Sequence, residues 1–208
     1  MVHSDADLID DGGASLGMGV LESLRITGRE RHDLVTSRGI RALVRRNLVT
    51  GQTALIRRSL VDLSAQIPEG WVHDEWWGLI AASMDGLLLD PRVFQSYRQH
   101  AGNEIGASKS GWERLKERLS EPQTAFRDRH RVRHQGLERF MEGPLWPGHE
   151  GATNVLRGRL RHYAWQAQLP APKILRLGPI VWKLMSGEYS RYRRGFFDAM
   201  RDFLQPAA

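Results

Sequence analysis

The stretch from Trp71 to Gly106 most constrains the fold, because it carries an ionisable cluster at each end of an apolar segment. It begins with the acidic and aromatic run His73-Asp74-Glu75-Trp76-Trp77, and a basic run, Tyr97-Arg98-Gln99-His100, lies near its end. A folded element with polar side chains at both ends can supply two parts of one site. We therefore expect the rest of the chain to complete a site built around this stretch.

Hydrophobic periodicity predicts that the first half of the chain mixes helices with short strands. Helices are expected over residues 34–48, 57–63 and 76–84, and short strands over residues 53–56 and 87–89. Residues 25–33 are polar and predict a connector. In the helix over residues 76–84, the predicted buried face consists of Trp77, Ile80, Ala81 and Met84.

After Gly106 the pattern is typical of helices alone. Apolar stripes at helical spacing predict helices over residues 109–119, 153–166, 174–185 and 189–204. A boundary near Lys109 therefore divides a mixed α/β region, residues 1–108, from an all-helical subdomain, residues 109–208.

Charge and composition limit the classes of partner. The 208 residues include 30 basic and 24 acidic side chains, and the net charge of +6 favours nucleic acid, anionic lipid headgroups or phosphorylated small molecules. There is no cysteine, which excludes a disulfide framework and thiolate metal ligands. No apolar run approaches the roughly 18 residues of a membrane span, and no signal-peptide pattern opens the chain. These features predict a soluble or peripheral protein.

Two closely spaced carboxylates, Asp5 and Asp7, stand in the acidic segment at the start of the chain. Oxygen ligands at this spacing suit a divalent cation such as Mg²⁺ or Mn²⁺. An EF-hand loop counted from Asp5 is excluded, because its fifth and twelfth positions are Ile9 and Leu16 rather than acids. The alternative is a solvated, frayed acidic tail.

Four motifs in order along the chain resemble glycosyltransferase family 2, and most of all its bacterial rhamnosyltransferase-like members. They are Ser4-Asp5-Ala6-Asp7, Asn47-Leu48-Val49-Thr50-Gly51, His73-Asp74-Glu75-Trp76, and Tyr97-Arg98-Gln99-His100 with Asn103 and Gly106. Residues 184–192 and 198–204 also resemble the helical tail of that group. The likeness spans nearly the whole chain. It implies a GT-A catalytic domain that transfers a sugar from a nucleotide diphosphate sugar to a hydroxyl of a glycan or a lipid-linked acceptor.

The resemblance also implies a divalent metal, Mn²⁺ or Mg²⁺, as cofactor. Asp5-Ala6-Asp7 matches the family's DxD motif, whose last aspartate typically holds the ion that bridges the two phosphates. His100 matches a C-terminal histidine that often supplies a further ligand. A metal at this position neutralises the negative charge that develops on the diphosphate leaving group.

The other matched residues imply roles in proton transfer and donor binding. Asp74 matches the acid that, in inverting members, takes the proton from the acceptor hydroxyl. Its aromatic neighbours predict partial desolvation, which suits a general base. Arg98 can meet a phosphate bidentately. Thr50 and Gly51 match the glycine-bearing loop near the donor sugar and the acceptor.

Each of these residues has a structural alternative. Asp74 also fits the N-terminal cap of the helix that follows it. The two tryptophans after it are of a type that more often fills a core than binds a sugar. His100 can make an ordinary hydrogen bond, and Arg98 can form a structural salt bridge.

The basic run over residues 127–134 predicts a solvated helix face or a peripheral contact with a membrane. With the resemblance, this favours a cytoplasmic protein, peripheral at the inner membrane where lipid-linked acceptors are found. Nucleic acid is disfavoured as a partner, because the arginines are spread over several predicted helices without a nucleic-acid-binding motif. A non-catalytic half-domain that binds a partner is the alternative to an enzyme.

The chain departs from the family in one respect, since a nucleotide-binding half precedes the DxD motif in the family. Asp5 is the fifth residue, so the expected fold is an incomplete GT-A, Rossmann-like sheet without the strands that contact base and ribose. Two explanations for the missing half are open. Either the start of the chain was assigned at an internal methionine, or the chain is a degenerate or fragmentary copy of such an enzyme. Alone, the chain is expected to bind a nucleotide sugar poorly, to lack transfer activity, and to have an unpaired sheet edge.

Overall fold

A computed structural model describes residues 1–99 and 123–205, which form two compact units. Of these residues, the first unit contains 1–67, 71–99 and 147–152, and the second contains 68–70, 123–146 and 153–205. The predicted boundary near Lys109, the predicted helix over residues 109–119 and the candidate ligand His100 lie outside the described residues. The predicted α/β class is confirmed, because a small mixed sheet is combined with helices.

The sheet of the first unit is centred on its first strand. The strands are β1 (Val2–Ile9), β2 (Ser15–Gly19), β3 (Ala54–Leu55) and β4 (Leu88–Arg98). β4 runs parallel to β1 along one edge, whereas β2 and β3 are antiparallel to it and pair with opposite halves of its other edge. β4 pairs with β1 alone among the described residues.

The beginning of the chain is a strand, and the alternative of a frayed acidic tail is wrong. Ala6 and Leu8 are buried with Val20 in the core of the unit, whereas Asp7 is exposed. This alternation follows from the two-residue period of a strand. The acidic residues therefore occupy one face of β1 while the apolar residues between them fill the core.

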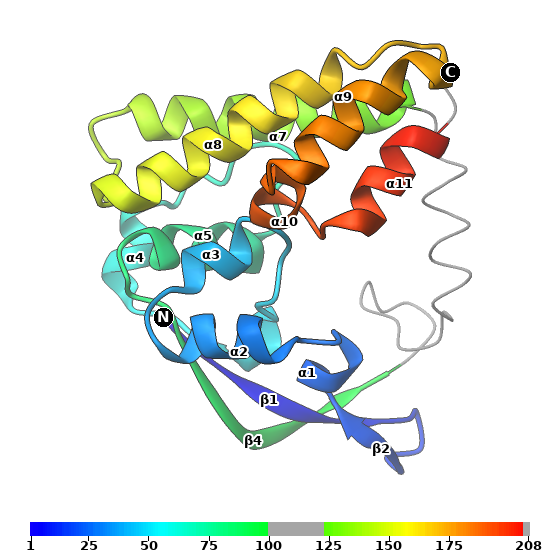
Figure 1. The fold of residues 1–208 in the computed structure, drawn as a ribbon. Coiled ribbons are helices and arrows are strands. Elements are labelled where there is room, and N and C mark those ends of the chain that lie inside the picture. The colour runs from blue at the N-terminus through cyan, green and yellow to red at the C-terminus, as the bar shows by residue number, and fades with distance from the viewer. Residues whose placement is uncertain (100–122, 206–208) are drawn as a thin grey trace. The chain divides into compact units, whose positions relative to one another are not determined.

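Six short helical segments lie within residues 1–99 of the first unit. They are α1 (Val20–Ser23), α2 (Gly28–Val35), α3 (Gly39–Leu43), the 3₁₀ turn η1 (Gly51–Thr53), α4 (Arg58–Leu63) and α5 (His73–Ser83). Helices α1 and α2 lie on one side of the strands, where they pack against β1 and β4 respectively (Figure 1). The predicted helix over residues 57–63 and the strand over residues 53–56 are confirmed within one or two residues.

Two predictions between residues 25 and 48 are wrong. The polar connector is helix α2, which begins with a capping box in which Thr27 and Glu30 satisfy each other's backbone amides. The single helix over residues 34–48 is interrupted at Ser37, whose φ of 55° is left-handed and incompatible with a continuing helix. The Thr-x-x-Glu pattern was the available signal for the first of these.

Helix α5 is where the sequence predicts it, but its buried face differs. Trp76, Leu79 and Ile80 are fully buried, whereas Trp77 is half-buried and Met84 is exposed. Apolar residues surround much of this helix. Periodicity alone therefore did not decide whether the buried face begins at Trp76 or at Trp77.

The described part of the second unit is built from helices. They are α7 (Gln123–Glu142), α8 (Glu150–Ala167), α9 (Lys173–Met185), α10 (Glu188–Tyr192) and α11 (Phe196–Leu204). The helices predicted over residues 153–166 and 174–185 are confirmed as α8 and α9. The single helix predicted over residues 189–204 is wrong, because Gly195 (φ 64°) separates α10 from α11. No helix in the described part of the chain is long and apolar enough to cross a membrane.

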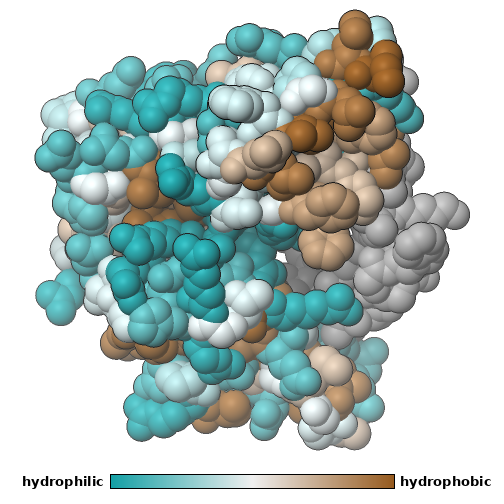
Figure 2. All heavy atoms as spheres, viewed as in Figure 1, coloured by the Kyte–Doolittle hydropathy of each residue, from teal (hydrophilic) through white to brown (hydrophobic). Residues whose placement is uncertain are grey.

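Large apolar side chains gather on the outside of α9 and α11. Figure 2 shows these brown and tan side chains over the two helices, which pack against each other. On α9 they are Ile174, Leu175, Leu177, Val181, Trp182 and Met185. On α11 they include Phe196 and Phe197. A smaller core beneath them contains Leu169, Ile180, Tyr189 and Ala199.

Candidate functional site

The first turn of α5 places the Asp74 carboxylate against the turn η1. Asp74 is buried, its Oδ2 accepts a hydrogen bond from the Gly51 amide at 2.9 Å, and its Oδ1 accepts one from the Glu75 amide at 2.6 Å. The first amides of a helix lack partners within the helix and favour a nearby negative charge. The helix is capped at Val72 without a side-chain bond, so the alternative of Asp74 as the N-cap residue is wrong.

Gly51 is a glycine because its neighbours come too close for a side chain. A Cβ at this position would lie 2.8 Å from His73 Nε2 and 3.3 Å from Asp74 Cβ. The first separation is below any ordinary contact, and the second atom is fixed by the helix. The absence of a Cβ thus allows the backbone to approach the carboxylate.

Thr50 lies beside this contact and is buried. Its carbonyl accepts hydrogen bonds from the amide and from the hydroxyl of Thr53, both at 3.0 Å. Its own hydroxyl is buried without a hydrogen-bond partner in the described part of the structure. The structure thus brings together three of the predicted site residues: Thr50, Gly51 and Asp74.

Gln52 ties the turn η1 to β4. Its Nε2 donates to the Ser96 carbonyl at 3.2 Å, and the Gln95 side chain donates to the Gln52 carbonyl at 2.6 Å. Ser96 is the register partner of Asp7 in β1. Gln52 therefore connects the Gly51–Asp74 contact to the part of the sheet that carries Asp7. Our sequence prediction did not include Gln52, although it directly follows the glycine of the motif.

The two aspartates of β1 are held differently. Asp5 Oδ1 accepts hydrogen bonds from the amides of Ala6 at 2.9 Å and Leu21 at 3.0 Å, so this carboxylate fixes the start of α1. Asp7 is exposed. Across residues 1–99 and 123–205, no three carboxylate or imidazole side chains gather into a metal site. The predicted third ligand, His100, is not among the residues described.

Buried in the same strand, His3 is a further titratable group. Its burial lowers the pKa of the imidazole to about 4, and its Nε2 makes no hydrogen bond to any described residue. His3 pairs with Ala54 and Leu89 in the sheet. It is therefore a neutral core side chain near pH 7.

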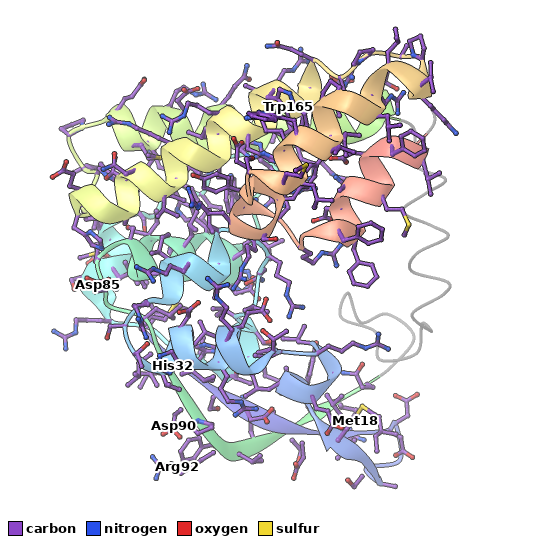
Figure 3. The ribbon with its side chains drawn as sticks, in the orientation of Figure 1. Met18, His32, Asp85, Asp90, Arg92 and Trp165 are labelled. Atoms are coloured by element: carbon purple, nitrogen blue, oxygen red, sulfur yellow. The ribbon has the colours of Figure 1, made fainter. Side chains whose placement is uncertain are left out.

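β4 is longer than predicted because a bulge carries it past a proline. Two extra residues of β4, Pro91 and Arg92, separate the positions that pair with Ser4 and Asp5. Proline cannot donate to the ladder, and a bulge accommodates it. Asp90 and Arg92 lie at this bend (Figure 3) and form an ion pair at 2.6 Å. The predicted turn after residue 89 is therefore a bulge within a strand that continues to residue 98.

Arg98, predicted to meet a phosphate, lies at the end of β4 and holds the connection between β1 and β2. Its Nη1 donates to the carbonyls of Asp10 at 3.2 Å and Asp11 at 2.5 Å. These bonds give Arg98 a structural task. The two bonds go to the backbone carbonyls of Asp10 and Asp11 and not to their carboxylates. They are therefore not the salt bridge that we gave as the alternative for Arg98.

The tryptophans beside Asp74 are mainly structural. Trp71 and Trp76 pack edge to face with their ring centroids 5.3 Å apart, and Trp76 Nε1 donates to the Ser64 carbonyl at 3.3 Å. The half-buried Trp77 ring packs against His73, 5.8 Å away. Trp76 therefore has the core role that we gave to tryptophan as the alternative, whereas Trp77 is only half-buried.

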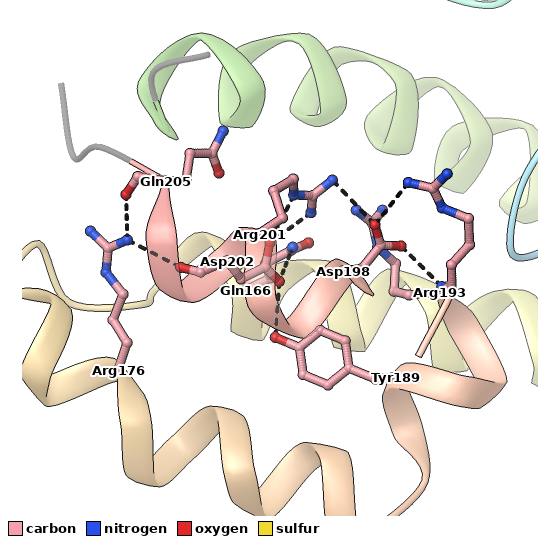
Figure 4. A network of polar contacts seen from close by, with 9 residues as sticks. Gln166, Arg176, Tyr189, Arg193, Asp198, Arg201, Asp202 and Gln205 are labelled. Atoms are coloured by element: carbon pink, nitrogen blue, oxygen red, sulfur yellow. Dashed lines mark hydrogen bonds and ion pairs between the residues drawn. The ribbon is translucent and has the colours of Figure 1, made fainter. Parts of the chain in front are cut away.

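The second unit contains a buried polar network centred on α11 (Figure 4). The Asp198 carboxylate contacts the guanidinium groups of Arg194 at 3.1 Å, Arg193 at 3.4 Å and Arg201 at 3.8 Å. Burial raises the pKa of the Asp198 carboxyl, but these three charges outweigh it and hold that pKa well below its usual range. A carboxylate so thoroughly paired is a structural anion.

Asp202 and Arg176 extend this network. Asp202 accepts hydrogen bonds from Arg201 at 2.6 Å, from the Tyr189 hydroxyl at 2.9 Å and from Gln166 at 2.5 Å. Burial and the nearby Asp202 raise the pKa of the Tyr189 phenol far above its usual value. Arg176 is fully buried, and its guanidinium donates only to backbone carbonyls in the bonds that are seen here. The network locks α8, α9, α10 and α11 together.

Comparisons of the chain with protein-family models, with curated proteins and with solved structures found no match.

Proposed function

We propose that this chain is part of a family 2-like glycosyltransferase that transfers a sugar from a nucleotide diphosphate sugar to a glycan or lipid-linked acceptor hydroxyl. The observation that carries the proposal is the hydrogen bond from the Gly51 amide to Asp74 Oδ2. It joins two of the four motifs on which the resemblance rests, and its two residues are 23 apart in sequence.

Asp74 is the proposed general base. Each of its carboxylate oxygens accepts one hydrogen bond from a backbone amide. A carboxylate oxygen has two lone pairs and can accept a second hydrogen bond. The remaining lone pairs can take the proton of an acceptor hydroxyl while the two amides hold the carboxylate in place. A fixed orientation of this kind is what general-base catalysis requires.

Thr50 and Gly51 would form the floor of the acceptor and donor-sugar site. The Thr50 hydroxyl has no protein partner among the residues described, so a sugar hydroxyl could supply one. We propose that Arg98 contributes positive charge for the diphosphate.

The aspartates of β1 fit a divalent ion that keeps several waters. Mg²⁺ and Mn²⁺ sites of this class take one or two carboxylates together with the phosphates of the substrate. Asp7 is exposed and would be the principal ligand, with Asp5 Oδ2 beside it, because Oδ1 of Asp5 already accepts two amides. When bound, the ion neutralises charge on the departing diphosphate.

The test is a transfer assay on protein purified from its natural source, after its intact mass has been measured. A panel of nucleotide diphosphate sugars is supplied with Mn²⁺, and release of the nucleotide diphosphate is followed. Asp74→Asn should lower the rate by about 10²- to 10⁴-fold. Asp62→Asn is the matched control, since Asp62 is an exposed carboxylate on α4 in the same unit.

A parent protein that turns over no donor in the panel would contradict the proposal, as would an Asp74→Asn variant with the parent rate. Circular dichroism of each variant separates loss of chemistry from loss of fold.

A second candidate function, a partner-binding half-domain, is favoured by the outer edge of β4. This strand has eleven residues and pairs with β1 alone in the part of the chain that the structure describes. An open edge can take up a strand from another chain. Under this alternative Asp74→Asn leaves the partner's binding unchanged, and charge substitutions along β4 abolish it.

A further inference from the structure

Helices α9 and α11 present an apolar surface that is exposed among residues 1–99 and 123–205. Trp182 is 71% exposed and Met185 is 80% exposed on α9, and Phe197 is 65% exposed on the adjacent α11. Figure 2 shows apolar side chains gathered on this face. A soluble monomer seldom exposes so many large apolar side chains side by side, and such a surface marks an interaction site. We call it the α9–α11 surface.

The inward side of α9 already anchors the helix without this surface. Arg176 and Ile180 are buried, and Arg176 donates to the carbonyls of Pro170 and Gln205 among others. The helix thus buries Ile180 and Arg176 on its inward side and exposes Trp182 on its outward side. The outward apolar side chains are therefore available for a partner.

The charge around the α9–α11 surface is positive. Lys173 and Arg191 are its exposed cations, whereas Arg176, Arg193 and Arg201 of the same segment, residues 173–205, are buried. Each acid contacts a cation: Glu188 contacts Lys183, and Asp198 and Asp202 both contact Arg201. Lys173, at the start of α9, is exposed. An apolar surface flanked by two exposed cations is complementary to an anionic lipid surface.

The length of α9 indicates how it would meet a bilayer. Its 13 residues are fewer than the roughly 20 that a spanning helix needs. A helix of this length with one apolar face lies in the plane of the interface, with the apolar side chains below the headgroups. Tryptophan is the residue that most favours this depth, and Trp182 is on the outward face.

We propose that the α9–α11 surface is a membrane-docking site that binds the second unit to anionic lipid. The sequence alone pointed to the basic run over residues 127–134 for such a contact. In the structure His134 of that run is buried and Arg131 pairs with Asp128, so the apolar surface on α9 and α11 is the stronger candidate. The proposal is independent of sugar transfer.

The test is co-sedimentation of the full chain with vesicles of phosphatidylcholine and phosphatidylglycerol, compared with vesicles of phosphatidylcholine alone. The parent should bind the anionic vesicles more strongly, and high salt should weaken this binding. Trp182→Gln and Phe197→Gln should each reduce the partition coefficient about tenfold, because each removes one large apolar side chain from the bilayer. Lys173→Gln should reduce it about fivefold on anionic vesicles only.

Leu145→Gln is the matched control. Leu145 is an exposed leucine of the same unit that lies outside α9 and α11, so its loss should leave vesicle binding unchanged. Thermal unfolding of each variant checks that the fold is retained. The proposal is overturned if the parent ignores both kinds of vesicle, or if Trp182→Gln binds as the parent does. It is also overturned if the parent is a dimer in solution that Trp182→Gln dissociates, because the surface would then belong to a second copy of the chain.

Discussion

The Asp74 carboxylate accepts the amide hydrogen of Gly51 at 2.9 Å, which joins the first turn of α5 to the turn η1. Neither residue could take this position without the other. A side chain on Gly51 would hinder the approach of the backbone, and Asp74 supplies the acceptor for the partly buried amide.

Removing the acceptor should destabilise the first unit. Asp74→Ala leaves the amides of Gly51 and Glu75 without their partner, which should reduce the free energy of unfolding by about 1 to 3 kcal/mol. Asp74→Asn retains one acceptor oxygen and should cost less. Urea unfolding of the two variants measures the difference. Equal stability of Asp74→Ala and the parent would show that water replaces the carboxylate.

A methyl group at Gly51 should lower the free energy of unfolding, in part because it would collide with the His73 side chain. The added Cβ would lie 2.8 Å from His73 Nε2 and 3.3 Å from Asp74 Cβ. We expect Gly51→Ala to destabilise the protein by about 1 to 3 kcal/mol. Because His73 is exposed and can move, Gly51→Ala combined with His73→Ala should recover part of the loss. A double-mutant cycle with no coupling energy would contradict this account.

The two aspartates of β1 should respond differently to substitution. Asp5→Ala removes an acceptor for the amides of Ala6 and Leu21 and should lower stability by about 1 to 3 kcal/mol. Asp7→Ala should leave stability within about 0.5 kcal/mol of the parent, because Asp7 is exposed. If our proposal for the metal is right, the same Asp7→Ala substitution should abolish Mn²⁺ binding, which titration calorimetry measures. Undiminished Mn²⁺ binding by Asp7→Ala would exclude it as the principal ligand.

Asp198 should contribute strongly to the stability of the second unit. Asp198→Asn leaves three guanidinium groups without their shared carboxylate, and loss of one partner in a buried ion pair costs about 3 to 5 kcal/mol. Because the pKa of Asp198 is depressed in the folded state, its contribution is complete above the ordinary carboxyl pKa of about 4. It is lost as the pH falls below that value. Acid unfolding should therefore be less steep in Asp198→Asn than in the parent.

His134 should make the second unit less stable in mild acid. Burial and the charge of Arg159 lower the pKa of His134 to about 3 in the folded state. Below the ordinary histidine pKa of about 6.5, the unfolded chain binds a proton that the folded chain does not, so stability falls by about 1.4 kcal/mol per pH unit for each such histidine. This loss ends near pH 3, where the folded state also protonates.

The matching variant is His134→Phe, which keeps an aromatic ring against Tyr163 at a centroid separation of 4.0 Å in the parent. Its free energy of unfolding between pH 6 and 4 should fall less steeply than that of the parent, by the contribution of one histidine. An unchanged slope would mean that His134 is protonated in the folded protein.

The sequence by itself determined the positions of several elements. Apolar spacing located α4, α8 and α9. The alternation of apolar and acidic residues over residues 2–9 is that of a strand, although we predicted none there. The sequence also located the turn at Thr50-Gly51 and the helix that begins near Asp74. These features were accessible because they depend on neighbours a few residues apart, whose periods are fixed by backbone geometry.

Only the tertiary structure decided which partners those residues take. The bond between Gly51 and Asp74 spans 23 residues, and the Arg98 bonds to Asp10 and Asp11 span 88 and 87. Local periodicity carries no information about contacts at this separation. It also reveals a helix without saying which side is covered. In α9 the covered side holds Arg176 and the outer side holds Trp182, because the backbone carbonyls that satisfy the arginine come together only in the folded unit.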